Sequence, residues 1–193
     1  MKQAGVTSLQ KLIEGNKRFL SGDAAHPNQS AERRKEVADL PKPFAVILAC
    51  ADARVPTEII FDQGIGDLFV VRNAGNIVTD EVLGSIEYAV KYFSVRLIVV
   101  LGHTNCGAVS SAVQGGEFPG HIPFLVKAIQ PALTIAKAKP GDLIFNTVNV
   151  NISLAVDKLK TSAPVLDKYV KTKGLQITGA YYNMHTGEVI FIK

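Results

Sequence analysis

Three short runs of uninterrupted apolar residues constrain this chain more than any other feature of its sequence. They are Phe44 to Leu48, Leu68 to Val71 and Leu97 to Leu101. A strand with one solvated face alternates apolar and polar residues, so an uninterrupted run is typical of a strand that is covered on both faces. The runs alternate with segments of helical periodicity. This pattern predicts an α/β fold of three layers around a mainly parallel central β-sheet.

The two ends of the chain are expected to depart from this pattern. Leu175 to Tyr182 and Glu188 to Ile192 flank a turn, which predicts a hairpin and therefore an antiparallel C-terminal strand. Near the other end, Ser8 to Leu20 reads as an amphipathic helix with Ser8 as its N-cap, and Ser30 to Ala38 as a short charged helix. Further helices are expected over residues 80–93, 123–137, 142–159 and 164–173, and from just after residue 103.

We therefore expect one domain over residues 1–193. A helical arm at 1–40 has little apolar surface of its own and is expected to pack on another surface, such as a second subunit. Residues 41–193 form the α/β core.

The composition excludes several functional classes. Hydrophobic residues make up 47% of the 193 residues and charged residues 20%, as in a globular protein. The net charge of +4 is spread along the chain, so no nucleic-acid partner is expected. No stretch approaches the roughly 20 apolar residues of a membrane span. The first 15 residues lack the apolar centre of a signal peptide, which predicts a cytoplasmic protein without a membrane partner.

The only two cysteines lie in two segments that each follow an apolar run. Cys50 belongs to the segment Ala49 to Arg54, and Cys106 to the segment Gly102 to Gly107, which also contains His103. If the two strands are neighbours, their carboxyl ends bring these segments together. His103 and Cys106 are three residues apart and would share a face on the first turn of a helix.

These side chains favour a zinc site. Two thiolates and an imidazole suit zinc, and three protein ligands leave a fourth position, as in catalytic zinc sites. Taken singly, Cys50 and Cys106 read as buried packing residues and His103 as a hydrogen-bonded core histidine. Their coincidence at strand ends, in a chain without a secretion signal, favours a metal site over a disulfide.

Asp52 and Arg54 admit two arrangements. Residues two apart on an extended chain point the same way, so both can project with Cys50. Asp52 could ligate the metal, or it could pair with Arg54 and accept a hydrogen bond from water at the metal. A surface ion pair without function is the simpler alternative.

Taken together, the two segments resemble those of the β-class carbonic anhydrases. The resemblance runs from about Lys11 to the C-terminus and includes Gly66 to Gly75, Ser85 to Ala89 and Gly179 to Tyr182. It implies one zinc ion per chain. The ligands that it implies are Cys50, His103 and Cys106, with Asp52 either as the fourth ligand of a closed form or paired with Arg54 as a catalytic residue.

The resemblance also implies an activity and an assembly. The activity is the reversible hydration of carbon dioxide to bicarbonate and a proton by zinc-bound hydroxide. The assembly is a homodimer or a dimer of dimers, with a substrate pocket at the subunit interface formed by Phe69, Tyr88 and the backbone amide of Gly107. Many members carry a substrate-binding Gln nine residues before the first cysteine, where this chain has Pro41.

Two alternatives remain on the sequence alone. The same ligand set occurs in hydrolases of carbonyl sulfide or carbon disulfide, and a homologue closed by Asp52 would bind zinc without catalysis. The proton relay is not identified. His26, His121 and His185 are expected to be solvated, with His121 a weak candidate for that role.

Overall fold

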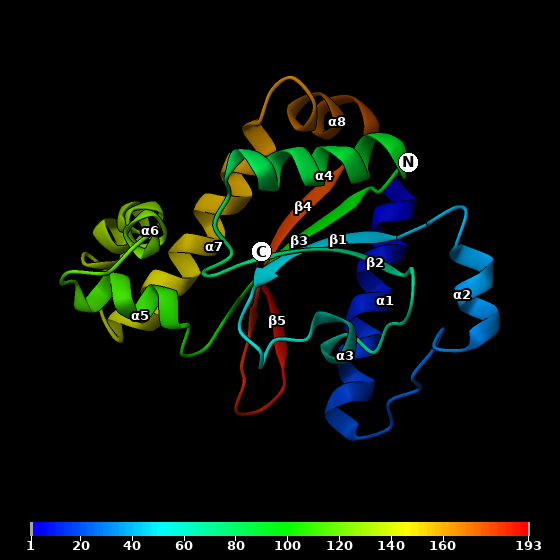
Figure 1. Cartoon of the computed structure of the whole chain (residues 1–193), viewed down its shortest axis with the longest axis horizontal. Coiled ribbons are helices and arrows are strands. Elements are labelled where there is room, and N and C mark those ends of the chain that lie inside the picture. The colour runs from blue at the N-terminus through cyan, green and yellow to red at the C-terminus, as the bar shows by residue number, and fades with distance from the viewer. Residues whose placement is uncertain (1, 193) are drawn as a thin grey trace.

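The computed structural model describes residues 2–192, with side chains from residue 8 onward, and places a five-stranded sheet between helices over that part of the chain (Figure 1). The strands lie in the order β2-β1-β3-β4-β5. β1 to β4 are parallel and β5 is antiparallel to β4, as the apolar runs and the C-terminal hairpin predicted. The strands are β1 (Ala45–Cys50), β2 (Leu68–Asn73), β3 (Leu97–His103), β4 (Gln176–Tyr182) and β5 (Val189–Ile192).

Helices cover both faces of the sheet. On one face, α4 and α7 cover the sheet in an apolar cluster that includes alternate residues of β1 and β3, among them Val46 and Val100, and α5, α6 and α8 add residues to this cluster. On the other face, Leu12 of α1 and Ile60 of α3 join a cluster with Ile47 of β1. The helices are α1 (Lys2–Ser21), α2 (Ala31–Val37), α3 (Thr57–Ile60), α4 (Asp80–Tyr92), α5 (Gly107–Gln114), α6 (Ile122–Ala136), α7 (Leu143–Thr161) and α8 (Leu166–Lys173).

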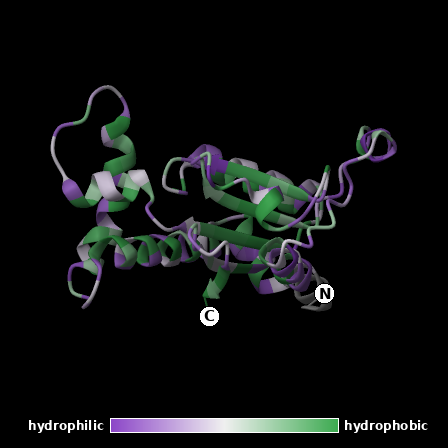
Figure 2. Ribbon diagram, turned by 90° about the horizontal axis from the view of Figure 1, so that it is seen from below, coloured by the Kyte–Doolittle hydropathy of each residue, from purple (hydrophilic) through white to green (hydrophobic). Residues whose placement is uncertain are grey.

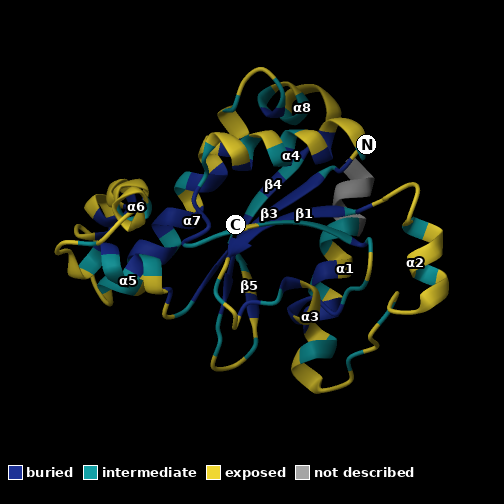
Figure 3. Ribbon diagram, in the orientation of Figure 1, coloured by how far each residue is buried: buried dark blue, intermediate teal, exposed yellow. Residues whose placement is uncertain are grey.

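The strands supply the centre of the apolar core. Every residue of β1 and β3 is buried, whereas β2, at the edge of the sheet, is only half-buried (Figure 3). Figure 2 shows the strands as a hydrophobic band between the two helical layers. Burial on both faces explains why the strands of the parallel sheet lack the usual alternation. None of the described helices is long and apolar enough to cross a membrane.

Several predicted boundaries are wrong. α1 begins at Lys2, so Ser8 lies inside the helix and is not its N-cap. β3 continues to His103, because this residue pairs with Tyr182 of β4. α5 then begins only at Gly107, with Cys106 in extended conformation before it. His103 and Cys106 therefore do not share a helical turn.

The N-terminal segment is attached to the core through a buried carboxylate. α2 has no buried residue and stands away from the sheet (Figure 1). The Asp62 carboxylate, after α3, accepts hydrogen bonds from the backbone amides of Ala25 and His26, both at 2.9 Å, and from the guanidinium of Arg18. Burial alone would raise the pKa of Asp62, but these donors lower it. The carboxylate therefore stays ionised and fastens the loop after α1.

Replacing this carboxylate should weaken the attachment. Asp62 has φ +45°, a conformation that asparagine tolerates, so Asp62→Asn removes the charge without adding backbone strain. We expect the free energy of unfolding to fall by about 1–3 kcal/mol, because buried donors lose a charged acceptor. Urea unfolding measures the change. The control is Asp23→Asn, an exposed aspartate near the end of α1, and equal stability of the two variants would contradict the prediction.

Candidate metal centre

The ends of β1 and β3 bring three metal-binding side chains together. In the pairing of these parallel strands Ala49 lies opposite Leu101, so β1 ends at Cys50 next to the last two residues of β3, Gly102 and His103. Cys106 joins them from the N-cap position of α5. The ligand atoms of Cys50, His103 and Cys106 all lie within 4.8 Å of one another, and all three residues are buried.

One nitrogen of His103 is left free to bind a metal. Its Nδ1 lies 2.7 Å from the carbonyl oxygen of Thr104, which can only accept, so Nδ1 carries the proton. Nε2 is then an unprotonated, buried nitrogen with no hydrogen-bond partner among the described residues. An uncompensated buried acceptor is costly, and a metal ion would remove this cost.

The two sulfur atoms also suit a cation. The Sγ atoms of Cys50 and Cys106 lie 4.0 Å apart, and the amide of Gly75 donates to Cys50 Sγ at 3.4 Å. The hydrogen bond from the Cys106 thiol lowers the pKa of Cys50, whereas that same bond and burial raise the pKa of Cys106. Without a metal these opposite shifts favour one proton shared between the two sulfur atoms. A divalent cation bound by both sulfurs would stabilise two thiolates.

Gly75 allows the chain to pass close to this pair. Its φ of +80° is strained for any other residue, and a Cβ atom there would come within 2.9 Å of Ile129. The backbone turn at this glycine is what presents its amide to Cys50.

Asp52 lies beside the cluster and forms an ion pair with Arg54. The carboxylate accepts from Arg54 Nε at 3.0 Å and Nη2 at 2.8 Å, and from the Arg54 amide at 2.9 Å. These contacts hold the pKa of Asp52 well below its usual range, so the carboxylate is ionised. Of the two arrangements left open by the sequence, this structure has the pairing with Arg54. Asp52 as a fourth metal ligand stays a prediction.

A second arginine, which the sequence analysis did not assign to the site, fixes the segment after β1. Arg72 donates through Nε to the Cys50 carbonyl at 2.9 Å and through Nη2 to the Asp52 carbonyl at 2.7 Å. It lies on β2 opposite Ala49. Its signal in the sequence was its place in the segment Gly66 to Gly75, which resembles the family, but only the strand pairing shows what it holds.

The comparisons with known proteins agree with this geometry. A family model described as carbonic anhydrase matches residues 45–189. Carbonic anhydrase 2 of Mycobacterium tuberculosis is 40% identical in an alignment of 191 positions that covers 96% of this chain and 91% of that protein. This chain belongs to the carbonic anhydrase family.

Solved structures place it in the β class. The β-carbonic anhydrase of Coccomyxa, in complex with acetazolamide, superposes with a TM-score of 0.75 at 25% identity, over 95% of this chain and 86% of that one. One of two tetrameric β-carbonic anhydrases from Sordaria macrospora superposes with a TM-score of 0.77 at 22% identity, over 96% of this chain and 97% of that one. These comparisons confirm the predicted resemblance to the β-class carbonic anhydrases.

Of the predicted substrate residues, Gly107 lies at the metal centre of its own chain, whereas Phe69 and Tyr88 do not gather there. Gly107 begins α5, one residue after Cys106, with open space beside its Cα. Phe69 instead lies opposite Val46, four residues before Cys50 along β1, a distance of about 13 Å. Tyr88 is half-exposed on α4 and belongs with Phe69 to one aromatic cluster, since both rings contact Phe93.

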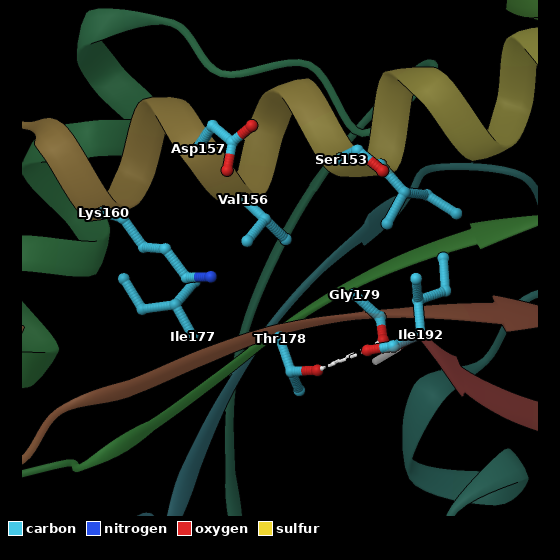
Figure 4. Close-up of a pocket in the computed structure, with 9 residues that line it drawn as sticks. Ser153, Val156, Asp157, Lys160, Ile177, Thr178, Gly179 and Ile192 are labelled. Atoms are coloured by element: carbon cyan, nitrogen blue, oxygen red, sulfur yellow. Dashed lines mark hydrogen bonds between the residues drawn. The ribbon is translucent and has the colours of Figure 1, made fainter.

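A hollow elsewhere in the carbonic anhydrase is unrelated to this chemistry. It has a volume of about 320 Å³ and lies between α7 and the first half of β4, with Asp157 and Lys160 at its rim and Ile177 and Thr178 on the strand (Figure 4). The metal centre is at the opposite, carboxyl end of the strands. None of the three clustered side chains lines this hollow.

Arg72 offers a test of how the metal centre is held. Arg72→Lys should lower zinc affinity about 10- to 100-fold, because one ammonium group cannot hold both carbonyls and the segment carrying Cys50 loosens. Competition with a chromogenic chelator measures the affinity. Arg96→Lys is the matched control, since Arg96 also donates to two backbone carbonyls, those of Val90 and Val95, away from the cluster. Equal affinities in the two variants would contradict the role of Arg72.

The shared proton of the two cysteines gives a second test. Zinc binding near neutral pH should release about one proton per ion, mainly from Cys106, because zinc binds thiolates and the pKa of Cys106 is raised whereas that of Cys50 is lowered. Calorimetry in buffers of different ionisation enthalpy counts the protons. Cys106→Ser should bind zinc more weakly and abolish most of the release. Release of two protons by the original protein would show that both cysteines are thiols before zinc binds.

Proposed function

We propose that this chain catalyses the reversible hydration of carbon dioxide to bicarbonate and a proton, with Cys50, His103 and Cys106 holding one zinc ion. The observation that carries the proposal is the free, buried Nε2 of His103 beside two buried sulfur atoms. Bound zinc would supply the Lewis acid that makes water a nucleophile near neutral pH. Family membership supports the same reaction.

The residues of the chain would orient the reactants. Asp52, held ionised by Arg54, would accept a hydrogen bond from the attacking water and direct its lone pair at carbon dioxide. The amide of Gly107, among the unpaired N–H groups at the start of α5, would donate to a substrate oxygen. The guanidinium of Arg54 balances the negative charge that the carboxylate brings beside the two sulfur atoms. This supports an open, active site over a zinc protein closed by Asp52.

The pocket is proposed to be completed by a second copy of the chain. Phe69 and Tyr88 lie too far from the metal centre of their own chain, on a half-buried edge strand and on an exposed helix face. In a homodimer, or a dimer of dimers, each chain would supply these aromatic side chains to its partner's site. The Sordaria macrospora relatives are described as tetrameric. Pro41, exposed before β1, offers no side-chain donor to that pocket.

The remaining sequence predictions stay proposals. They are the single domain with an arm at 1–40 and a core at 41–193, the cytoplasmic location, and the absence of nucleic-acid and membrane partners. Helix α2, which has no buried residue, is the part of the arm best placed to contact a second subunit.

The reaction is tested by stopped-flow hydration of carbon dioxide from about pH 6.5 to 9, with zinc content measured in parallel. We expect about one zinc per chain and hydration that increases toward alkaline pH. Sulfide release from carbonyl sulfide and carbon disulfide, measured on the same preparation, should be much slower. A zinc-loaded protein without hydration even at alkaline pH would contradict the proposal.

Asp52→Asn tests the orienting carboxylate. Hydration should fall about 100-fold with zinc content unchanged, because the amide cannot accept through both oxygens or hold Arg54 by charge. Asp157→Asn, on the exposed face of α7, is the control and should keep full activity. If Asp52→Asn lost zinc in proportion to activity, Asp52 would be a ligand.

A further inference from the structure

We propose that His185 relays the proton released by the reaction from the metal centre to solvent. The inference rests on the proposed function. Each hydration of carbon dioxide by water yields bicarbonate and one proton, and this proton must leave before the next turnover. His185 lies at the turn of the β4–β5 hairpin, far along the sequence from the metal-binding segments.

The hairpin turn is hydrogen-bonded to Thr104, the first residue after β3 and its terminal His103. The amide of Thr104 donates to the Tyr182 carbonyl at 3.0 Å, and Thr104 Oγ1 accepts from the amide of Met184 at 2.9 Å. Within the turn, Asn183 Oδ1 accepts from the amide of His185 at 2.9 Å. The position of His185 is therefore set by bonds that reach from the metal-binding loop into the turn.

A line of polar contacts connects His185 with Asp52. His185 Nε2 lies 3.5 Å from Nδ2 of Asn105. In the sequence, Asn105 lies between His103 and Cys106. The carbonyl of Asn105 accepts from Arg54 Nη2 at 3.5 Å, and Arg54 holds the Asp52 carboxylate. The line thus runs from beside the cluster to an exposed imidazole.

His185 is the member of this line suited to carry a proton. Arg54 stays charged at any relevant pH, and its contacts keep Asp52 ionised. Imidazole is the side chain that exchanges protons near neutral pH. The Asn105 amide can serve both forms of the ring, donating from Nδ2 to the neutral imidazole and, after a flip, accepting at Oδ1 from the imidazolium.

The relay is a simple proton transfer. The neutral imidazole takes one proton from the site by way of intervening solvent, becomes imidazolium and passes the proton to a buffer base. The ring returns to its neutral form, and no electron is transferred.

The other exposed histidines lie on different elements. His121 precedes α6, with its ring centroid 6.1 Å from that of Phe124. The backbone amide of His26 bonds to Asp62 in the N-terminal segment. His121, the candidate suggested by the sequence, is therefore the rival to be tested, and His26 supplies a control.

The test compares His185→Gln, His121→Gln and His26→Asn by stopped-flow hydration in a dilute, bulky buffer without imidazole. His185→Gln keeps a polar side chain of similar reach but cannot carry the proton. We expect kcat to fall about tenfold, with kcat/KM and zinc content nearly unchanged, because proton release limits kcat only. Added imidazole should restore kcat. His26→Asn should behave as the original protein.

A second measurement avoids catalysis. In the zinc-free protein, long-range ¹H–¹⁵N spectra should show that Asn105→Ala shifts the imidazole signals of His185 and leaves those of His26 in place. Signals of His185 that do not respond would overturn the contact on which the relay depends.

The outcomes separate the relay from the reaction itself. An active protein whose kcat is unchanged by His185→Gln, or is lowered by His121→Gln instead, would overturn the relay alone. Equal losses in kcat and kcat/KM without rescue by imidazole would make His185 a structural residue and would also overturn it. A zinc-loaded original protein without hydration would overturn the proposed function, and the relay with it.

Discussion

The parallel pairing of β1 with β3 is the constraint on which the site depends. It brings the ends of the two strands together, and the turn at Thr104 and Asn105 then places Cys106 within reach of Cys50 and His103. Two sulfur atoms 4.0 Å apart in a buried position repel each other once both are ionised. A divalent cation between the two thiolates attracts both of them and offsets their repulsion. The fold therefore brings together negative charges that need a cation to balance them.

Two arginines keep that site in order, and they act on different parts of the chain. Arg72 donates to two backbone carbonyls, those of Cys50 and Asp52, whereas Arg54 makes a bidentate pair of hydrogen bonds with the Asp52 carboxylate. The planar guanidinium is suited to both tasks, because it places several donors in a fixed plane. As a result the carboxylate lies close to the cluster, yet its charge is balanced by Arg54.

Local sequence was sufficient for the strands and for the three clustered side chains. Uninterrupted apolar runs identified β1, β2 and β3, and the positions of Cys50, His103 and Cys106 at their ends identified the cluster. Features that depend on tertiary pairing were missed or misplaced. β3 extends through His103 because β4 pairs with it, which moved the start of α5, and Arg72 acquired its role only through the register of β2 on β1. The His185 contact joins residues 80 positions apart, a separation that no local pattern can reveal.

The position of the aromatic cluster bears on why such a chain would assemble. The metal centre lies at the carboxyl end of the sheet, whereas Phe69 and Tyr88 lie back along β2 and α4, on surface that is only partly covered. A single chain can therefore hold the metal, but its Phe69 ring lies back along β2, away from its own metal centre. In the proposed dimer the exposed aromatic surface and the incomplete pocket would complete each other. Burial of that surface would stabilise the dimer, so the same contacts would drive assembly and enclose the substrate. Metal binding would then be a property of one chain, and catalysis a property of two.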